Sequence, residues 1–198
     1  MGLFLVGGCR ALPDAAAVPP GGRGAGARGD EIEAGFRNGK ALLESGDHTA
    51  AIKQFAYLRD HARNPDERDR AVVALSMALQ DSGNRGAALG VLEPLPEYPR
   101  TGLEAMKCVL AGELHLHQQN FGRARVWLSR GLEVEANSRK PYRAAALFNL
   151  GKALVAENQL EDALVAFGEA RDAFSANGDE TKAEQCKLIL ADIRRALQ

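Results

Sequence analysis

A small residue followed twelve positions later by an alanine recurs four times in this chain, and this spacing constrains the fold more than any other feature. The four pairs are Gly39 and Ala51, Ser76 and Ala88, Gly112 and Ala124, and Gly151 and Ala163. Successive alanines lie 37, 36 and 39 residues apart, and each is followed after four positions by a large apolar residue: Phe55, Leu92, Leu128 and Phe167. Internal repeats of this period indicate a stacked array of helix pairs.

Apolar residues around each small residue recur at helical spacing. In one segment, Leu147, Leu150, Gly151 and Leu154 follow the pattern of an amphipathic face, and no segment after Glu31 alternates as a strand would. Two antiparallel helices approach most closely where only small side chains separate them, so we expect the small residue and the alanine to meet there. Gly and Asn tolerate the left-handed backbone of a helix end, which predicts turns at 45–47, 81–84, 118–120 and 157–159.

The fourth repeat carries a family resemblance. Leu147-x2-Leu150-Gly151-x2-Leu154, followed by Ala163-x3-Phe167, resembles the tetratricopeptide repeat (TPR) pattern. The chain lacks the first-position Trp of that family, and extra residues between its repeats, at 63–65, 94–101 and 137–141, lengthen the period. The resemblance implies an all-α, right-handed superhelical solenoid. It would contain about four antiparallel helix pairs over residues 31–178, followed by a C-terminal capping helix over residues 179–198.

Several helix ends can be predicted from local signals. Asn64 followed by Pro65 and two acidic residues is typical of a helix start, and Pro94 should cut the second helix of the second pair short. After Gly178 and Asp179, the apolar stripe of the capping helix is Ala183, Cys186, Leu190, Ile193 and Leu197. Its Lys and Arg residues are expected to be solvated.

Residues 1–30 differ in composition, with 8 of the 21 glycines and 3 of the 8 prolines, so we expect a flexible tether there. The apolar residues and two glycines before Cys9 resemble a bacterial lipobox, with Cys9 as the lipidated residue. No Lys or Arg precedes Cys9, and the apolar stretch is shorter than a signal peptide needs. A start codon assigned too late would explain both departures; the alternative is an unstructured cytosolic N-terminus with an incidental cysteine.

Several classes of function are disfavoured. Twenty-five Lys and Arg against 26 Asp and Glu argue against a nucleic-acid partner, and no apolar run is long enough to span a membrane. Cys108 and Cys186 fall at apolar positions and are expected to be buried. His115 and His117 would face different sides of a helix, and no metalloprotease, phosphate-loop or serine-hydrolase motif occurs. We therefore expect no catalytic, metal or cofactor site.

The TPR resemblance implies a peptide-binding groove on the concave side, lined by the first helix of each pair. The corresponding residues are Phe36, Lys40, Leu43, Val73, Met77, Gln80, Val109, Glu113, Leu116, Phe148, Lys152 and Val155. Such a mostly apolar trough suits an amphipathic helix or an extended peptide, whereas the alternative is that several of these residues pack against neighbouring repeats. Phe36, Val73, Val109 and Phe148 stand where carboxylate-gripping relatives carry clamp residues, which disfavours that clamp. Phe121 and Trp127 are expected to pack between repeats.

The leading hypothesis is a non-catalytic scaffold that holds a protein segment. It would be lipid-anchored through Cys9 in a bacterial envelope and face the periplasm. By resemblance, TPR lipoproteins of this kind help to assemble outer-membrane machines such as secretins, pili or the barrel-insertion complex. The alternatives are a soluble cytosolic adaptor or regulator and a subunit that associates with itself through the edge of the array. The partner and the oligomeric state are left open by the sequence.

Overall fold

The computed structural model describes residues 26–93, 103–135 and 142–198, and these contain nine α-helices and no strand. The helices are α1 (Gly26–Glu44), α2 (His48–Asp60), α3 (Pro65–Asp81), α4 (Arg85–Leu92), α5 (Glu104–His117), α6 (Phe121–Glu135), α7 (Tyr142–Ala156), α8 (Leu160–Ala176) and α9 (Glu180–Ala196). The all-α prediction is therefore confirmed.

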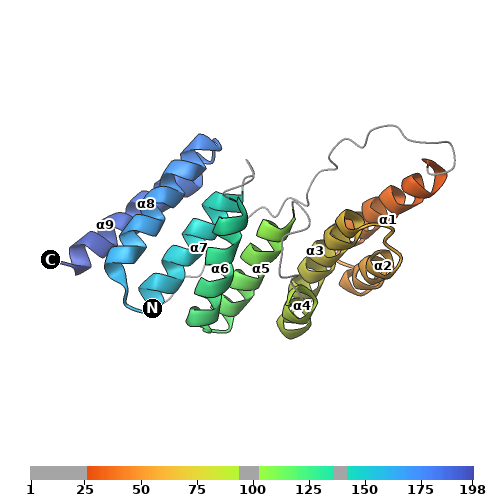
Figure 1. The fold of residues 1–198 in the computed structure, drawn as a ribbon, viewed down its shortest axis with the longest axis horizontal. Coiled ribbons are helices and arrows are strands. Elements are labelled where there is room, and N and C mark those ends of the chain that lie inside the picture. The colour runs from red at the N-terminus through yellow and green to blue at the C-terminus, as the bar shows by residue number, and fades with distance from the viewer. Residues whose placement is uncertain (1–25, 94–102, 136–141) are drawn as a thin grey trace.

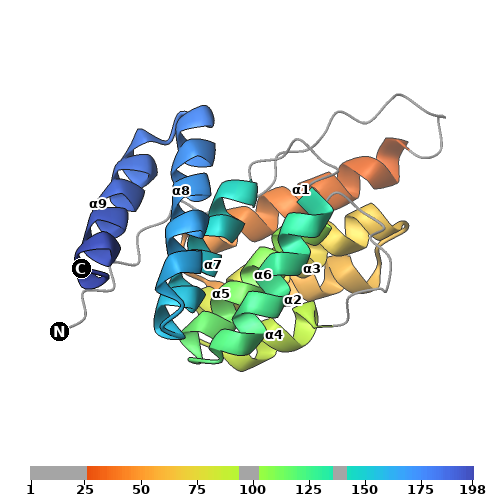
Figure 2. The ribbon, with the colours of Figure 1, turned by 60° about the vertical axis from the view of Figure 1, so that its left-hand side comes forward.

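The helices form four consecutive pairs, α1–α2, α3–α4, α5–α6 and α7–α8, followed by the single helix α9. They succeed one another along the longest axis of the molecule, from α1 at one end to α9 at the other (Figure 1). In the view turned by 60°, α8 and α9 lie side by side at one edge (Figure 2). Contacts run mainly between helices that are neighbours in the chain, and α5 also contacts α7. This arrangement is the predicted solenoid of four pairs and a final helix.

The first helix begins earlier than expected. Because α1 begins at Gly26, residues 26–30 belong to it and not to the tether. The rest of the expected tether, including Cys9, lies outside the described residues.

The turns within the pairs use the left-handed backbone that their sequences predict. Gly46, Gly83 and Asn158 have φ angles of 81°, 83° and 58°, and Gly178 before α9 has 79°. Gln119 adopts φ 60° in the third turn, a conformation that side chains other than Asn and Asp rarely occupy. The third turn therefore keeps the geometry of the others without the residue type that favours it.

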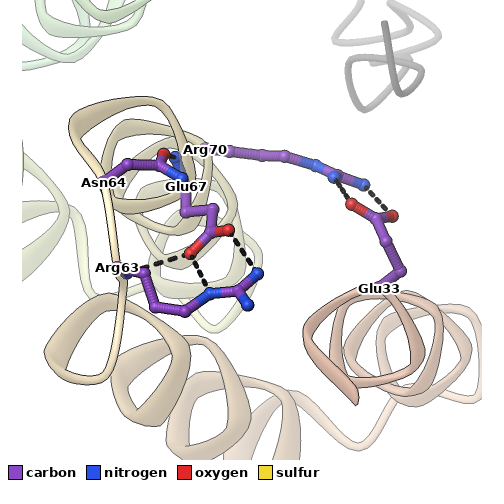
Figure 3. A network of polar contacts seen from close by, with 5 residues as sticks. All are labelled: Glu33, Arg63, Asn64, Glu67 and Arg70. Carbon is purple, nitrogen blue, oxygen red and sulfur yellow. Dashed lines mark hydrogen bonds and ion pairs between the residues drawn. The ribbon is translucent and has the colours of Figure 1, made fainter. Parts of the chain in front are cut away.

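Four helices begin with the side-chain caps that their sequences offer. Asn64 accepts a hydrogen bond from the backbone N–H of Glu67 at 2.8 Å, and the Glu67 carboxylate in turn accepts one from the backbone N–H of Arg63 at 2.9 Å (Figure 3). Asp47, Asn84 and Asp179 cap α2, α4 and α9 in the same way. At its other end, α4 stops at Leu92 after eight residues, as expected from Pro94.

Each small residue in the first helices makes room for a large one. A Cβ added at Gly39, Gly112 or Gly151 would lie 2.5–2.7 Å from the nearest atom of Phe55, Leu128 or Phe167 respectively. The side-chain atoms nearest to each added Cβ thus belong to the large apolar residue sixteen positions on, and the alanine expected at the crossing is fully buried in each pair. In the second pair, the Ser76 hydroxyl does reach the alanine, donating to the Ala88 carbonyl at 3.2 Å.

The core extends through the array. One large cluster of buried apolar side chains spans α1 to α5, another spans α7 to α9, and a small cluster around Ala124 and Leu128 lies between them in sequence. Cys108 and Cys186 are fully buried free thiols, as expected, and burial raises the pKa of Cys108 to about 12. Leu197 departs from the predicted stripe of α9 because it is 43% exposed.

Candidate functional site

The side chains expected to line a groove differ in exposure. Phe36, Val73, Met77, Gln80, Val109 and Phe148 are buried. Leu43, Glu113 and Leu116 are half-buried, and Lys40, Lys152 and Val155 are exposed. Five of these six residues are apolar and belong to the core, and Gln80 is a buried polar residue, which fits the alternative of packing against neighbouring repeats. The groove itself stays a prediction.

At the first end of the array, Arg70 of α3 covers the ring of Phe36 in α1. The guanidinium carbon lies 4.1 Å from the ring centroid, and its two terminal nitrogens donate to the two carboxylate oxygens of Glu33 (Figure 3). The cation is therefore held between an aromatic face and a carboxylate. This cover adds to the packing of Phe36 against Phe55 in the core, and together they leave Phe36 7% exposed.

The same ion pair belongs to a series that joins consecutive first helices. Each bridge links a residue to another about one repeat further along the chain, at separations of 37, 38 and 36 residues. The bridges are Glu33 to Arg70 between α1 and α3, Asp69 to Lys107 at 2.9 Å between α3 and α5, and Glu113 to Asn149 at 2.9 Å between α5 and α7. The sequence analysis missed them, although polar residues paired at the repeat period are a signal that could have revealed them.

Lysines occupy the last junction, where α8 packs between α7 and α9. Lys152 of α7 places its ammonium 4.5 Å from the ring centroid of Phe148, and Lys182 of α9 places its own 5.4 Å from that of Phe174. The two rings meet edge to face, with centroids 6.0 Å apart. Neither lysine forms an ion pair with any residue of the described ranges.

The surroundings of Lys152 disfavour its charge. Partial desolvation lowers the pKa of Lys152 below the usual lysine value; Glu113 opposes this effect, and the positive charge of Lys182 adds to it. The only hydrogen bond from the Lys152 ammonium to the described residues is to the Asn149 amide oxygen, at 3.3 Å. The Glu113 carboxylate, which attracts the Lys152 ammonium, also accepts a hydrogen bond from the amide nitrogen of Asn149.

The histidines lie apart from this face. His115 is buried, with 1% of its surface exposed, and burial lowers its pKa, whereas His117 is exposed, so the two face different sides as expected. Trp127 is half-buried and packs against the first core cluster, and Phe121 is half-buried at the start of α6.

Two other kinds of site are absent from the described ranges. No group of three or more His, Cys, Asp or Glu side chains there is arranged to hold a metal ion. None of the helices described has the length and apolar character needed to cross a membrane.

No protein-family model matches this sequence, and no curated protein matches it either. Several solved structures are similar in fold. MamA (residue 41 to the end) from Desulfovibrio magneticus RS-1 is 17% identical, with a TM-score of 0.56 over 84% of this chain and 97% of that one. A kinesin light chain from Podosopora anserina with nearly identical TPR-like repeats is 16% identical, with a TM-score of 0.57 over 85% and 97%.

BtubC (BKLC) from P. vanneervenii is 17% identical, with a TM-score of 0.62 over 85% of this chain and 82% of that one. At these identities the likeness concerns the fold and nothing further. The chain therefore has the TPR-like solenoid fold that its repeats predict.

Proposed function

We propose that this chain is a non-catalytic scaffold that binds a peptide or helix of a protein partner along its first helices. The observation that supports this is the set of exposed or half-buried side chains at two repeated positions in α1, α5 and α7; the corresponding residues of α3 are buried. One position carries Lys40, Glu113 and Lys152, and the other, three residues on, carries Leu43, Leu116 and Val155. Alternating charged and apolar side chains suit a partner segment that is itself amphipathic.

The geometry of the array favours an extended partner. A stack of helix pairs presents equivalent positions at regular intervals, so a segment that lies along it meets several pairs at once. For a transient peptide complex of this kind we expect micromolar binding, about −8 kcal/mol.

Site-specific photo-crosslinking in the native host tests this proposal. A photoreactive residue at Leu116 or Val155 should form an adduct with a partner protein. The same residue at Val126 or Val165, which are 68% and 62% exposed on the second helices α6 and α8, serves as the matched control. Adducts from the controls alone would refute binding along the first helices.

We further propose that the scaffold is anchored to a bacterial envelope membrane by lipidation of Cys9 and helps to assemble a complex there. This proposal depends on the lipobox-like residues before Cys9. Labelled palmitate should enter the full-length gene product, and Cys9→Ala should move it from the membrane to the soluble fraction. Unlabelled protein with unchanged fractionation would refute the anchor and favour the alternative, a cytosolic adaptor.

A further inference from the structure

The last junction, where α7, α8 and α9 meet, differs from the others. At the three earlier junctions a polar bridge joins one first helix to the next. Here Lys152 and Lys182 lie over the rings of Phe148 and Phe174, whose centroids are 6.0 Å apart, so two positive charges share one aromatic pair. The acidic residues at the start of α9 are engaged elsewhere: Asp179 caps the helix, and Glu180 accepts a hydrogen bond from Ser175. Lys152 is exposed and Lys182 is half-buried, and neither ammonium lies within ion-pair distance of a carboxylate in the described ranges, although Glu113 attracts Lys152 from further away.

The first junction has a similar cation over an aromatic ring, and there the chain itself supplies the carboxylate that pairs with the cation. Phe36 and Phe148 occupy equivalent positions, three residues before Gly39 and Gly151, and a cation lies over each ring. Over Phe36, a carboxylate of the chain itself, that of Glu33, holds the cation. Over Phe148, Lys152 has no carboxylate of the described ranges within ion-pair distance, and Glu113 acts on it only from further away.

We propose that Lys152 and Lys182 bind an acidic side chain of the partner segment, so that the array recognises a peptide carrying Asp or Glu at its α7–α9 end. The rings of Phe148 and Phe174 form an apolar floor that holds both ammonium groups in place. A carboxylate between them relieves the repulsion of two like charges and gains two charge-assisted hydrogen bonds. This inference rests on the proposed function, because it names the chemistry of the partner at the same face.

Two synthetic peptides test it. One is a fluorescein-labelled amphipathic helix of leucine and glutamate, and the other replaces every glutamate with glutamine; both are acetylated and amidated, which removes the terminal charges. Fluorescence anisotropy should show tighter binding of the glutamate peptide to the full chain. Lys152→Gln and Lys182→Gln should each weaken this binding by about threefold, and together by about tenfold, which is the scale of partly exposed ion pairs.

Lys187→Gln is the matched control, because it removes the same charge from α9 at an exposed position already paired with Glu184. It should leave the affinity for the glutamate peptide unchanged, and circular dichroism should show that all variants stay folded. Equal affinity of the two peptides for the wild-type chain, or equal effects of the three lysine variants, would overturn the inference while leaving the proposed function standing.

Failure of both peptides to bind would overturn the proposed function and the inference together. Sedimentation of the chain with phosphatidylglycerol vesicles that depends on Lys152 and Lys182, without any preference for the glutamate peptide, would assign the site to an anionic membrane surface. That result would also overturn the inference.

Discussion

Gly151→Ala tests whether the glycine positions hold the helix pairs together. The added methyl group would lie 2.7–2.9 Å from three ring atoms of Phe167, closer than carbon atoms approach without displacement. Phe167 is 1% exposed, and its ring meets that of Phe148 edge to face at 5.6 Å, so it has little room to move. Overpacking of this kind costs about 1–3 kcal/mol, against a gain of about 1 kcal/mol in helix propensity.

Gly168→Ala in α8 is the matched control. It is the same substitution one residue after Phe167, but nothing lies within 4 Å of the added methyl group, so only the propensity gain of about 1 kcal/mol applies. Urea denaturation followed by circular dichroism should therefore place Gly151→Ala about 1–3 kcal/mol below Gly168→Ala in free energy of unfolding. Equal stability of the two variants, or a more stable Gly151→Ala, would refute the reasoning.

Three further predictions can be checked by denaturation. Phe148→Ala should lower the free energy of unfolding by about 3–5 kcal/mol, because the ring is core; a loss of peptide binding at unchanged stability would instead make it a groove residue. Asn64→Ala should cost about 1 kcal/mol by removing the cap of α3, and an unchanged urea midpoint would show that the cap contributes nothing. Because burial lowers the pKa of His115, the unfolded chain takes up its proton first, so stability should be lost as the pH falls through about 6.5 towards the folded pKa. His115→Gln should make that loss shallower in urea titrations at pH 5 to 8, and identical pH profiles would contradict this cause.

The helix pairs and their turns could be predicted because side-chain size and backbone freedom act locally. Gly46 and Gly83 take the left-handed conformation that few other residues tolerate, and Pro94 stands two residues after the last residue of α4. The partner of each glycine was harder to predict. Which side chain lies nearest to Gly151 depends on how far the second helix slides along the first, and in the structure it is that of Phe167.

The accessible face could be predicted only in part, because a residue's exposure depends on the neighbouring pair as well as on its own. Phe36 fits a groove position by its place in the repeat, but Arg70 of the next first helix covers it. Long side chains such as Arg and Lys extend over neighbouring helices, and a repeat pattern does not predict which residues they cover there. Lys152 was expected in the groove, but its association with Lys182 was not, because Lys182 lies in the final helix, which was expected only to close the array.

The packing of each helix mainly against its neighbours in the chain has a consequence for how the protein reaches its native state. Short loops suffice to bring such contacts together, so little chain entropy is lost before they form, and topologies of this kind fold quickly. Folding can begin at any helix pair and spread to the neighbouring pairs in both directions. We therefore expect the pairs to assemble during synthesis, one after another, as each leaves the ribosome.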